Sequence, residues 1–146
     1  MLSVYLAGNI VFMDQATSWE DSIRMAAQPL WQKGFITESY MDAMIENVHT
    51  NGPYIVIAPG VAMPHARNEG GVRKTGISLL KLKHPVRFPE EKDVQLLFVL
   101  AALDSTQHLD LMADLSTLLM DGEVMARLKH AQREEEVIQL VQLVEV

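Results

Sequence analysis

Apolar residues along the chain recur at helical spacing in some segments and in short unbroken runs in others. The first helical pattern spans 18–33, where Ser18 opens a sequence that resembles a capping box. Pro29 lies inside this pattern and is expected to kink or split the helix, because its ring displaces the preceding turn. Thr37 can cap a second helix, which the segment 50–53 ends with a glycine followed by a proline.

Three further helices are predicted in the second half of the chain. Ser105 is expected to be the N-cap of the first of them, and Asp121 can cap the second. The acidic first turn of the last helix suits the positive end of a helix dipole. These helices span 104–121, 122–131 and 134–146.

Short runs of apolar and β-branched residues predict four strands between the helices. The run at 94–103 is the most apolar and is expected to form the central strand, and the run at 54–58 is expected to be a buried strand. The other two are 9–13 and 75–82, the latter followed by Pro85. Alternation of helices and strands predicts an α/β fold: a single three-layer domain over residues 1–146, with a mixed β-sheet covered by helices on both faces.

Composition limits the partners and the chemistry of the chain. The formal net charge of -7 argues against nucleic acid and anionic membrane surfaces, which require clustered Lys and Arg. No apolar run approaches the length of a membrane span, and the first residues lack the basic region of a secretory signal. Without cysteine, disulfides and thiolate catalysis are excluded. We therefore expect a cytoplasmic protein that does not insert into a membrane.

His65 stands in the turn "APGVAMPHARNEGG", directly after a proline. Pro64 fixes its own φ angle and stiffens the backbone, while the small neighbours Ala62 and Ala66 leave space for a large partner. A neutral imidazole nitrogen is a nucleophile at neutral pH, and a hydrogen bond to the other ring nitrogen would fix the tautomer. A surface histidine in a proline-containing turn is the alternative.

His108 falls in the first turn of the helix that follows the central strand, at about its third position if Ser105 is the cap. The free N–H groups at such a helix start form an anion site, and the helix dipole favours the neutral imidazole. A first-turn histidine that packs partly on the core is the alternative. The two histidines are expected to face one cleft.

The other histidines, His49, His84 and His130, are expected on the surface. A basic group flanks the His65 turn, and in so acidic a chain it suggests phosphate chemistry, although a solvated loop would look similar. Its members are Arg67, Arg73 and Lys74.

The block "GVAMPHAR", together with "LAALDSTQHLDLMADLSTLL", strongly resembles the mannitol/fructose-type enzyme IIA domain. This is the phosphocarrier (type 2) of the bacterial phosphoenolpyruvate-dependent sugar phosphotransferase system (PTS). The resemblance covers nearly the whole chain and is greatest to the ascorbate-specific and cryptic-mannitol branch. It implies a phosphotransferase component that needs no cofactor and no metal.

The resemblance also implies roles and partners. His65 would accept a phosphoryl group from the phosphohistidine of HPr and pass it to a cysteine of enzyme IIB, a separate chain; membrane enzyme IIC would move the sugar. His108 would position the phosphoryl group, with Arg67 and Ser105 as phosphate-binding candidates. Mannitol-type relatives carry arginine where His49 aligns, which leaves open whether His49 contacts the group.

Two other functions compete with transport. A nitrogen-regulation type of domain would signal through its phosphorylation state on the same fold. A metal-dependent hydrolase would use His65, His108 and an acidic residue such as Asp104, but the chain has no short ligand spacing of the H-E-x-x-H kind.

The sugar never needs to touch this domain, so the identity of the sugar is inferred from the branch resemblance, with ascorbate first and a mannitol-type sugar second.

Overall fold

The computed structural model describes residues 1–145, so Val146, the end of the last predicted helix, lies outside them. Its centre is a five-stranded mixed sheet in the order β1-β4-β5-β3-β2. β5 pairs antiparallel with β4 and parallel with β3, which confirms the predicted central strand. The strands are β1 (Ile10–Met13), β2 (Val56–Ala58), β3 (Gly60–Ala62), β4 (Gly76–Phe88) and β5 (Lys92–Ala101).

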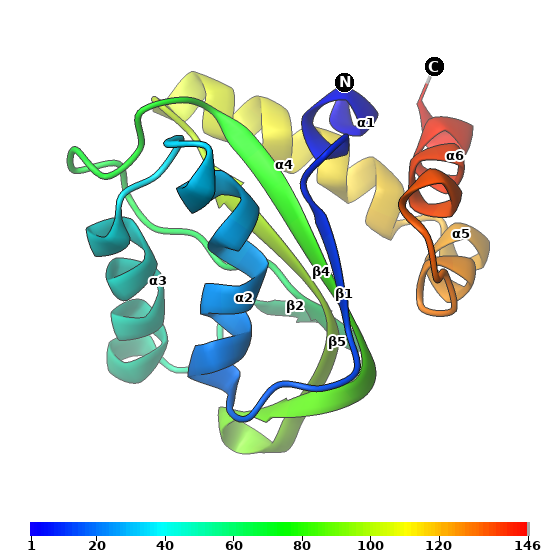
Figure 1. The fold of residues 1–146 in the computed structure, drawn as a ribbon, viewed down its shortest axis with the longest axis horizontal. Helices are drawn as coiled ribbons and strands as arrows, with labels where there is room; N and C mark the ends of the chain where they lie inside the picture. The colour runs from blue at the N-terminus through cyan, green and yellow to red at the C-terminus, as the bar shows by residue number, and fades with distance from the viewer. Residues whose placement is uncertain (146) are drawn as a thin grey trace.

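Helices cover both faces of this sheet, which confirms the predicted α/β class (Figure 1). One face packs against α2 (Trp19–Gln32) and α3 (Glu38–Asn51). The other face packs against α1 (Leu2–Leu6), α4 (Ser105–Leu119), α5 (Gly122–Leu128) and α6 (Glu134–Val144). A short 3-10 turn, Pro89–Glu91, joins β4 to β5.

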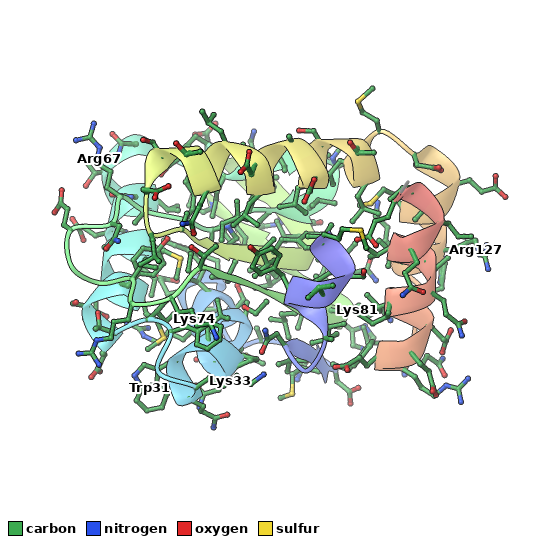
Figure 2. The ribbon with its side chains drawn as sticks, turned by 90° about the horizontal axis from the view of Figure 1, so that it is seen from above. Trp31, Lys33, Arg67, Lys74, Lys81 and Arg127 are labelled. Atoms are coloured by element: carbon green, nitrogen blue, oxygen red, sulfur yellow. The ribbon has the colours of Figure 1, made fainter. Side chains whose placement is uncertain are left out.

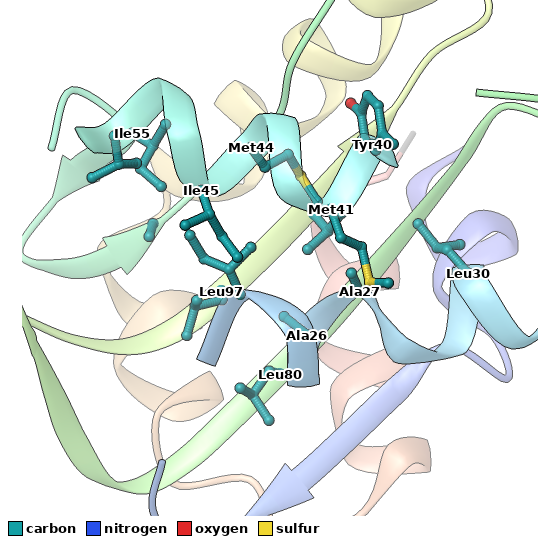
Figure 3. Close-up of a cluster of buried hydrophobic side chains, with 14 of the residues drawn as sticks. Ala26, Ala27, Leu30, Tyr40, Met41, Met44, Ile45, Ile55, Leu80 and Leu97 are labelled. Carbon is teal, nitrogen blue, oxygen red and sulfur yellow. The ribbon is translucent and has the colours of Figure 1, made fainter. Parts of the chain in front are cut away.

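The sheet separates two hydrophobic clusters, and β5 contributes alternate side chains to each of them. Leu97 and Val99 face α2 and α3, where Figure 3 shows Leu97 beside the buried side chains of α3. Leu96 and Phe98 face α4 and its neighbours. A strand buried on both faces needs an unbroken apolar run, which explains why β5 is so evident in the sequence.

All five predicted helices are present, and the first half of the chain differs from the helix predictions at two points. Ser18 caps α2 by accepting a hydrogen bond from the Asp21 N–H at 3.1 Å, but Pro29 does not split the helix. Pro29 lies in the last turn, so only one intrahelical bond is missing. α1, a five-residue helix that buries Leu2 and Leu6, was not predicted from the sequence.

Two strand predictions need correction. The strand predicted at 75–82 continues to Phe88 past Pro85, because the β4–β5 register shifts between Lys81 and Val86 and leaves the proline outside the regular ladder. The predicted buried strand at 54–58 shrinks to β2 at the sheet edge, where Ile57 is 42% exposed. β3, where the sequence predicts a turn, lies between β2 and β5.

Within residues 1–145, no helix combines the length and the apolar character needed to cross a bilayer.

Candidate functional site

A cavity of about 730 Å³ lies at the end of the sheet where β5 ends and α4 begins. Both histidines singled out in the sequence line it, as do Arg67 and Ser105. Three further groups of residues complete the wall: Ala43, Asn47 and Asn51 from α3; Tyr54, Ala66, Asn68 and Glu69 from the loops; and Ala102, Leu103 and Asp104 before α4.

The His65 ring is oriented by its own backbone. Its Nδ1 lies 2.7 Å from the Met63 carbonyl oxygen, which can only accept a hydrogen bond. Nδ1 therefore carries the proton, and the lone pair is on Nε2. Tyr54 packs edge-on against the ring, with 5.9 Å between ring centroids. The half-buried imidazole thus has one fixed nitrogen and one nucleophilic nitrogen.

The backbone around His65 is fixed by neighbouring strands. The Met63 N–H donates to the Ile55 carbonyl at 2.8 Å, and the Leu100 N–H donates to the Pro64 carbonyl at 3.0 Å. The turn predicted to be rigid is therefore attached to β5 as well as stiffened by proline. Such attachment limits how far the ring can move during a reaction.

His108 lies opposite His65, with 5.5 Å between the ring centroids and 45° between the ring planes. This confirms the expectation that the two rings face one cleft. Burial lowers the pKa of His108, and the neighbouring His65 lowers it further. The neutral form of His108, which can donate one hydrogen bond and accept another, is therefore favoured.

The start of α4 differs from the prediction by one residue. Asp104, not Ser105, is the N-cap, and its carboxylate accepts the Gln107 N–H at 2.9 Å. Ser105 is the first helical residue, and His108 is the fourth, with its N–H donating to the Asp104 carbonyl at 3.0 Å. The N–H groups of Ser105 and Thr106 precede this first intrahelical bond, and Ser105 lines the cavity, so an anion there can accept a hydrogen bond from the Ser105 N–H.

Two side chains tie the start of α4 to the loop that follows His65. Asn68 donates from Nδ2 to the Leu103 carbonyl at 2.9 Å, and the Leu103 N–H donates to Thr75 Oγ1 at 3.1 Å. Gln107 also contacts the Thr75 hydroxyl. These bonds fix the separation of the two segments that carry the histidines.

The basic group around the His65 turn does not act as a unit. Arg67 is exposed and lines the cavity, at the end of the molecule where α4 begins (Figure 2). Lys74 instead lies over the ring of Phe35, 4.8 Å from its centroid, and Arg73 is not among the residues that line the cavity. Arg67 is thus the member of the group placed to meet a phosphate.

The structure also places the remaining histidines. His49 lies 3.7 Å from a Glu20 carboxylate oxygen and 4.9 Å, ring to ring, from Trp19, so it faces α2 and not the cavity. His84 and His130 are not among the lining residues either. The polar side chains that α3 gives to the cavity are instead Asn47 and Asn51, which were not among the residues predicted from the sequence. Their four-residue spacing on one helix face was the available signal.

The arrangement fits transfer of a tetrahedral anion. It offers a nucleophilic Nε2, a second imidazole across the cleft, helix N–H groups and one arginine. Among residues 1–145, no three His, Asp or Glu side chains group closely enough to hold a metal ion. Phosphoryl transfer depends on positioning and charge stabilisation, both of which this cavity provides.

The lowered pKa of His108 predicts how stability depends on pH. The folded state binds this proton less well than the unfolded state, so stability should fall as the pH drops below the ordinary value of 6.5. His108→Gln has no such proton to bind. We expect the wild type to lose thermal stability relative to His108→Gln as the pH falls below 6.5, while the difference stays constant at higher pH. Thermal unfolding curves of both proteins from pH 8 to pH 5 measure this; parallel curves over the whole range would contradict it.

Comparison with known proteins agrees with this chemistry. Residues 4–143 match the family model described as the phosphoenolpyruvate-dependent sugar phosphotransferase system, EIIA 2. The chain is 37% identical to the mannitol-specific cryptic phosphotransferase enzyme IIA component of Escherichia coli strain K12 over 134 residues, covering 91% of each. It is 35% identical to that strain's ascorbate-specific PTS system EIIA component over 130 residues, covering 87% of this chain and 84% of the relative.

The solved structures that resemble the chain include a complex of two such proteins. The complex of Escherichia coli enzyme IIA for mannitol with phosphorylated enzyme IIB contains a chain that matches with a TM-score of 0.81 at 27% identity. The match covers 93% of this chain and 95% of that one. The fold is therefore shared with a protein solved together with a phosphorylated partner.

Proposed function

The chain belongs to the EIIA 2 family of the phosphoenolpyruvate-dependent sugar phosphotransferase system, and we propose that His65 is its phosphoryl carrier. In this proposal, His65 accepts a phosphoryl group from the phosphohistidine of HPr. It then passes the group to a cysteine of enzyme IIB, which drives sugar uptake through membrane enzyme IIC. A carrier that exchanges groups with HPr works in the cytoplasm.

The observation that carries the proposal is the fixed tautomer of His65. Because Nδ1–H is held by the Met63 carbonyl at 2.7 Å, the Nε2 lone pair is free to attack phosphorus. The new N–P bond forms from that lone pair, and the bond between phosphorus and the donor imidazole breaks, leaving its electron pair on the donor nitrogen. The Nδ1 proton stays in place, and the Met63 carbonyl dipole stabilises the positive charge on the phosphorylated ring.

In the second transfer, Nε2 of His65 is the leaving group and no longer the nucleophile. A cysteine thiolate attacks phosphorus, the N–P bond breaks, and its electron pair returns to Nε2 of His65. Residues 1–146 contain no cysteine, so in this proposal the acceptor cysteine belongs to enzyme IIB and not to this domain. The mannitol relative that was solved with phosphorylated enzyme IIB supports the same class of partner here.

The phosphoryl group adds roughly -1.5 to -2 charges at neutral pH, by analogy with other phosphorylated side chains. His108, at 5.5 Å ring to ring, is placed to donate a hydrogen bond to it. The N–H group of Ser105 and the Arg67 guanidinium complete the set of donors around the cavity. Together they offset the added charge within an otherwise acidic chain.

We propose a role in transport, because the two relatives named above are components specific for mannitol and ascorbate. Ascorbate is our first choice of sugar and a mannitol-type sugar the second. A regulatory domain of the nitrogen-regulation type is the alternative. It would be phosphorylated in the same way but would have no enzyme IIB acceptor, so the second transfer discriminates between the two roles.

The experiment that tests the proposal is a reconstituted phosphoryl relay. The purified protein is incubated with phosphoenolpyruvate, enzyme I and HPr, and intact-mass spectrometry should show the gain of one phosphoryl group. Adding an ascorbate-type or a mannitol-type enzyme IIB should discharge the label onto its cysteine. A protein that gains no phosphoryl group would refute the proposal, and a label that neither enzyme IIB removes would favour the regulatory role.

A further inference from the structure

The hydrogen bonding between the His65 loop and β5 is interrupted at one point. β3 pairs in parallel with β5, with Ala62 opposite Leu97. Continuing this register places His65 opposite Leu100. In a regular parallel ladder, the Leu100 N–H would donate to the Pro64 carbonyl and the Leu100 carbonyl would accept the Ala66 N–H. The first of these bonds is present at 3.0 Å.

The second bond is replaced by a side chain. The Ala66 N–H donates to the Tyr40 hydroxyl at 3.1 Å, and that hydroxyl donates to the Leu100 carbonyl at 2.6 Å. The Ala66 carbonyl lies farther from the same oxygen, at 3.2 Å. The Tyr40 hydroxyl is therefore inserted into the ladder directly after His65, and it holds the loop away from β5.

Tyr40 is held firmly in this position. It lies in the first turn of α3, where its N–H donates to Thr37 Oγ1 at 3.3 Å, and only 2% of its surface is exposed. A Cβ atom on Gly71 would lie 3.0 Å from Tyr40 Cβ, so the returning loop packs directly against it. Figure 3 shows Tyr40 in line with the buried side chains of α3. Burial raises its pKa to about 12, so the hydroxyl keeps the proton that it donates to Leu100.

We infer that Tyr40 is a positioning residue for phosphoryl transfer: its hydroxyl separates the chain from β5 after His65 and thereby fixes where the imidazole points. This inference rests on the function proposed above. Tyr40 is not among the residues that line the cavity, so it acts through the backbone and not on the phosphoryl group.

Removing the Tyr40 hydroxyl should let the Ala66 N–H donate directly to the Leu100 carbonyl, which would complete the β-ladder. In Tyr40→Phe, the Ala66 N–H and the Leu100 carbonyl lose their shared partner, and the direct bond between them becomes the way to satisfy both. The loop would then continue β3 as a regular strand and shift His65 relative to His108. A misplacement near 1 Å can cost about 10²-fold in rate, so we expect phosphoryl transfer from phospho-HPr to fall by about 10- to 100-fold.

Ser78→Ala is a matched control. Ser78 is fully buried and donates to the Ala26 carbonyl at 2.6 Å, as Tyr40 does to Leu100, but on the part of β4 that faces α2. Both variants lose one buried hydroxyl that binds a backbone carbonyl, so both should lower the melting temperature. Only Tyr40→Phe should lower the transfer rate, and ¹⁵N shifts of the His65 ring should show a mixture of tautomers in that variant alone.

The outcomes separate this inference from the function on which it rests. If the wild type is labelled by phospho-HPr and Tyr40→Phe is labelled equally fast with an unchanged His65 tautomer, Tyr40 does not position the site. If the wild type is not labelled, the proposed function fails. Should Tyr40→Phe not fold, the wild type still gives a test: NMR should show a slowly exchanging Tyr40 hydroxyl proton close to the Ala66 amide proton, and absence of that contact would overturn the inserted geometry.

Discussion

His65→Gln is expected to fold as the wild type does and to accept no phosphoryl group from phospho-HPr. Glutamine retains a polar side chain of similar reach at a position that lines the cavity, and the backbone bonds of the turn, such as the one from the Leu100 N–H to the Pro64 carbonyl, do not involve the imidazole. It has no nitrogen with a free lone pair, because that of the amide is delocalised into the carbonyl. The loss should therefore be complete, since the nucleophile itself is removed. Intact-mass spectrometry after incubation with phosphoenolpyruvate, enzyme I and HPr measures it.

His49→Gln is the matched control for this experiment. The substitution is chemically the same, but His49 faces Glu20 and Trp19 outside the cavity. We expect His49→Gln to be labelled at the wild-type rate. Labelling of His65→Gln at the wild-type level would show that another residue is the acceptor. A loss of labelling in His49→Gln would show that the α3 terminus takes part in the reaction.

The elements that the sequence predicts well are those whose burial leaves a pattern. β5 is buried on both faces and reads as one apolar run, and α2 and α3 carry a capping residue and a single apolar face. β2 and β3 have three residues each, too few for any periodicity, and their pairing is decided by contacts distant in the sequence. The edge position of β2 therefore could not be predicted from its composition.

In the candidate site, too, the residues with local sequence signals could be predicted, whereas those decided by distant contacts could not. His65 and His108 could be found because proline and a helix start leave local signals. The choice of Asp104 over Ser105 as cap could not be made, since both are favourable capping residues and the choice depends on contacts of Leu103 with Thr75 and Asn68. Tyr40 gave no signal at all, because its partners, Ala66 and Leu100, are 26 and 60 residues away.

His108→Ala is expected to separate the two transfers. His65 keeps its nucleophilic Nε2 in this variant, so phospho-HPr should still label it. The imidazole 5.5 Å away, ring to ring, is lost, and with it a donor to the phosphoryl oxygens as they move toward the enzyme IIB thiolate. Removing one such donor costs about 10²- to 10³-fold in comparable sites, so onward transfer should slow by about 10²-fold or more. Single-turnover measurements of label moving from His65 to enzyme IIB give this rate directly.

His108→Gln provides the control, because a glutamine at this position can still donate one hydrogen bond across the cleft. If His108 acts as a donor, this variant should recover part of the rate that His108→Ala loses, although glutamine is more flexible than an imidazole. Equal slowing in both variants would indicate that the ring's bulk matters and not its N–H. Finding the phosphoryl group on His108 in the wild type would reverse the two roles. That reversal is disfavoured by the backbone, since the Met63 carbonyl fixes the tautomer of His65 and so leaves the lone pair of Nε2 facing the cleft.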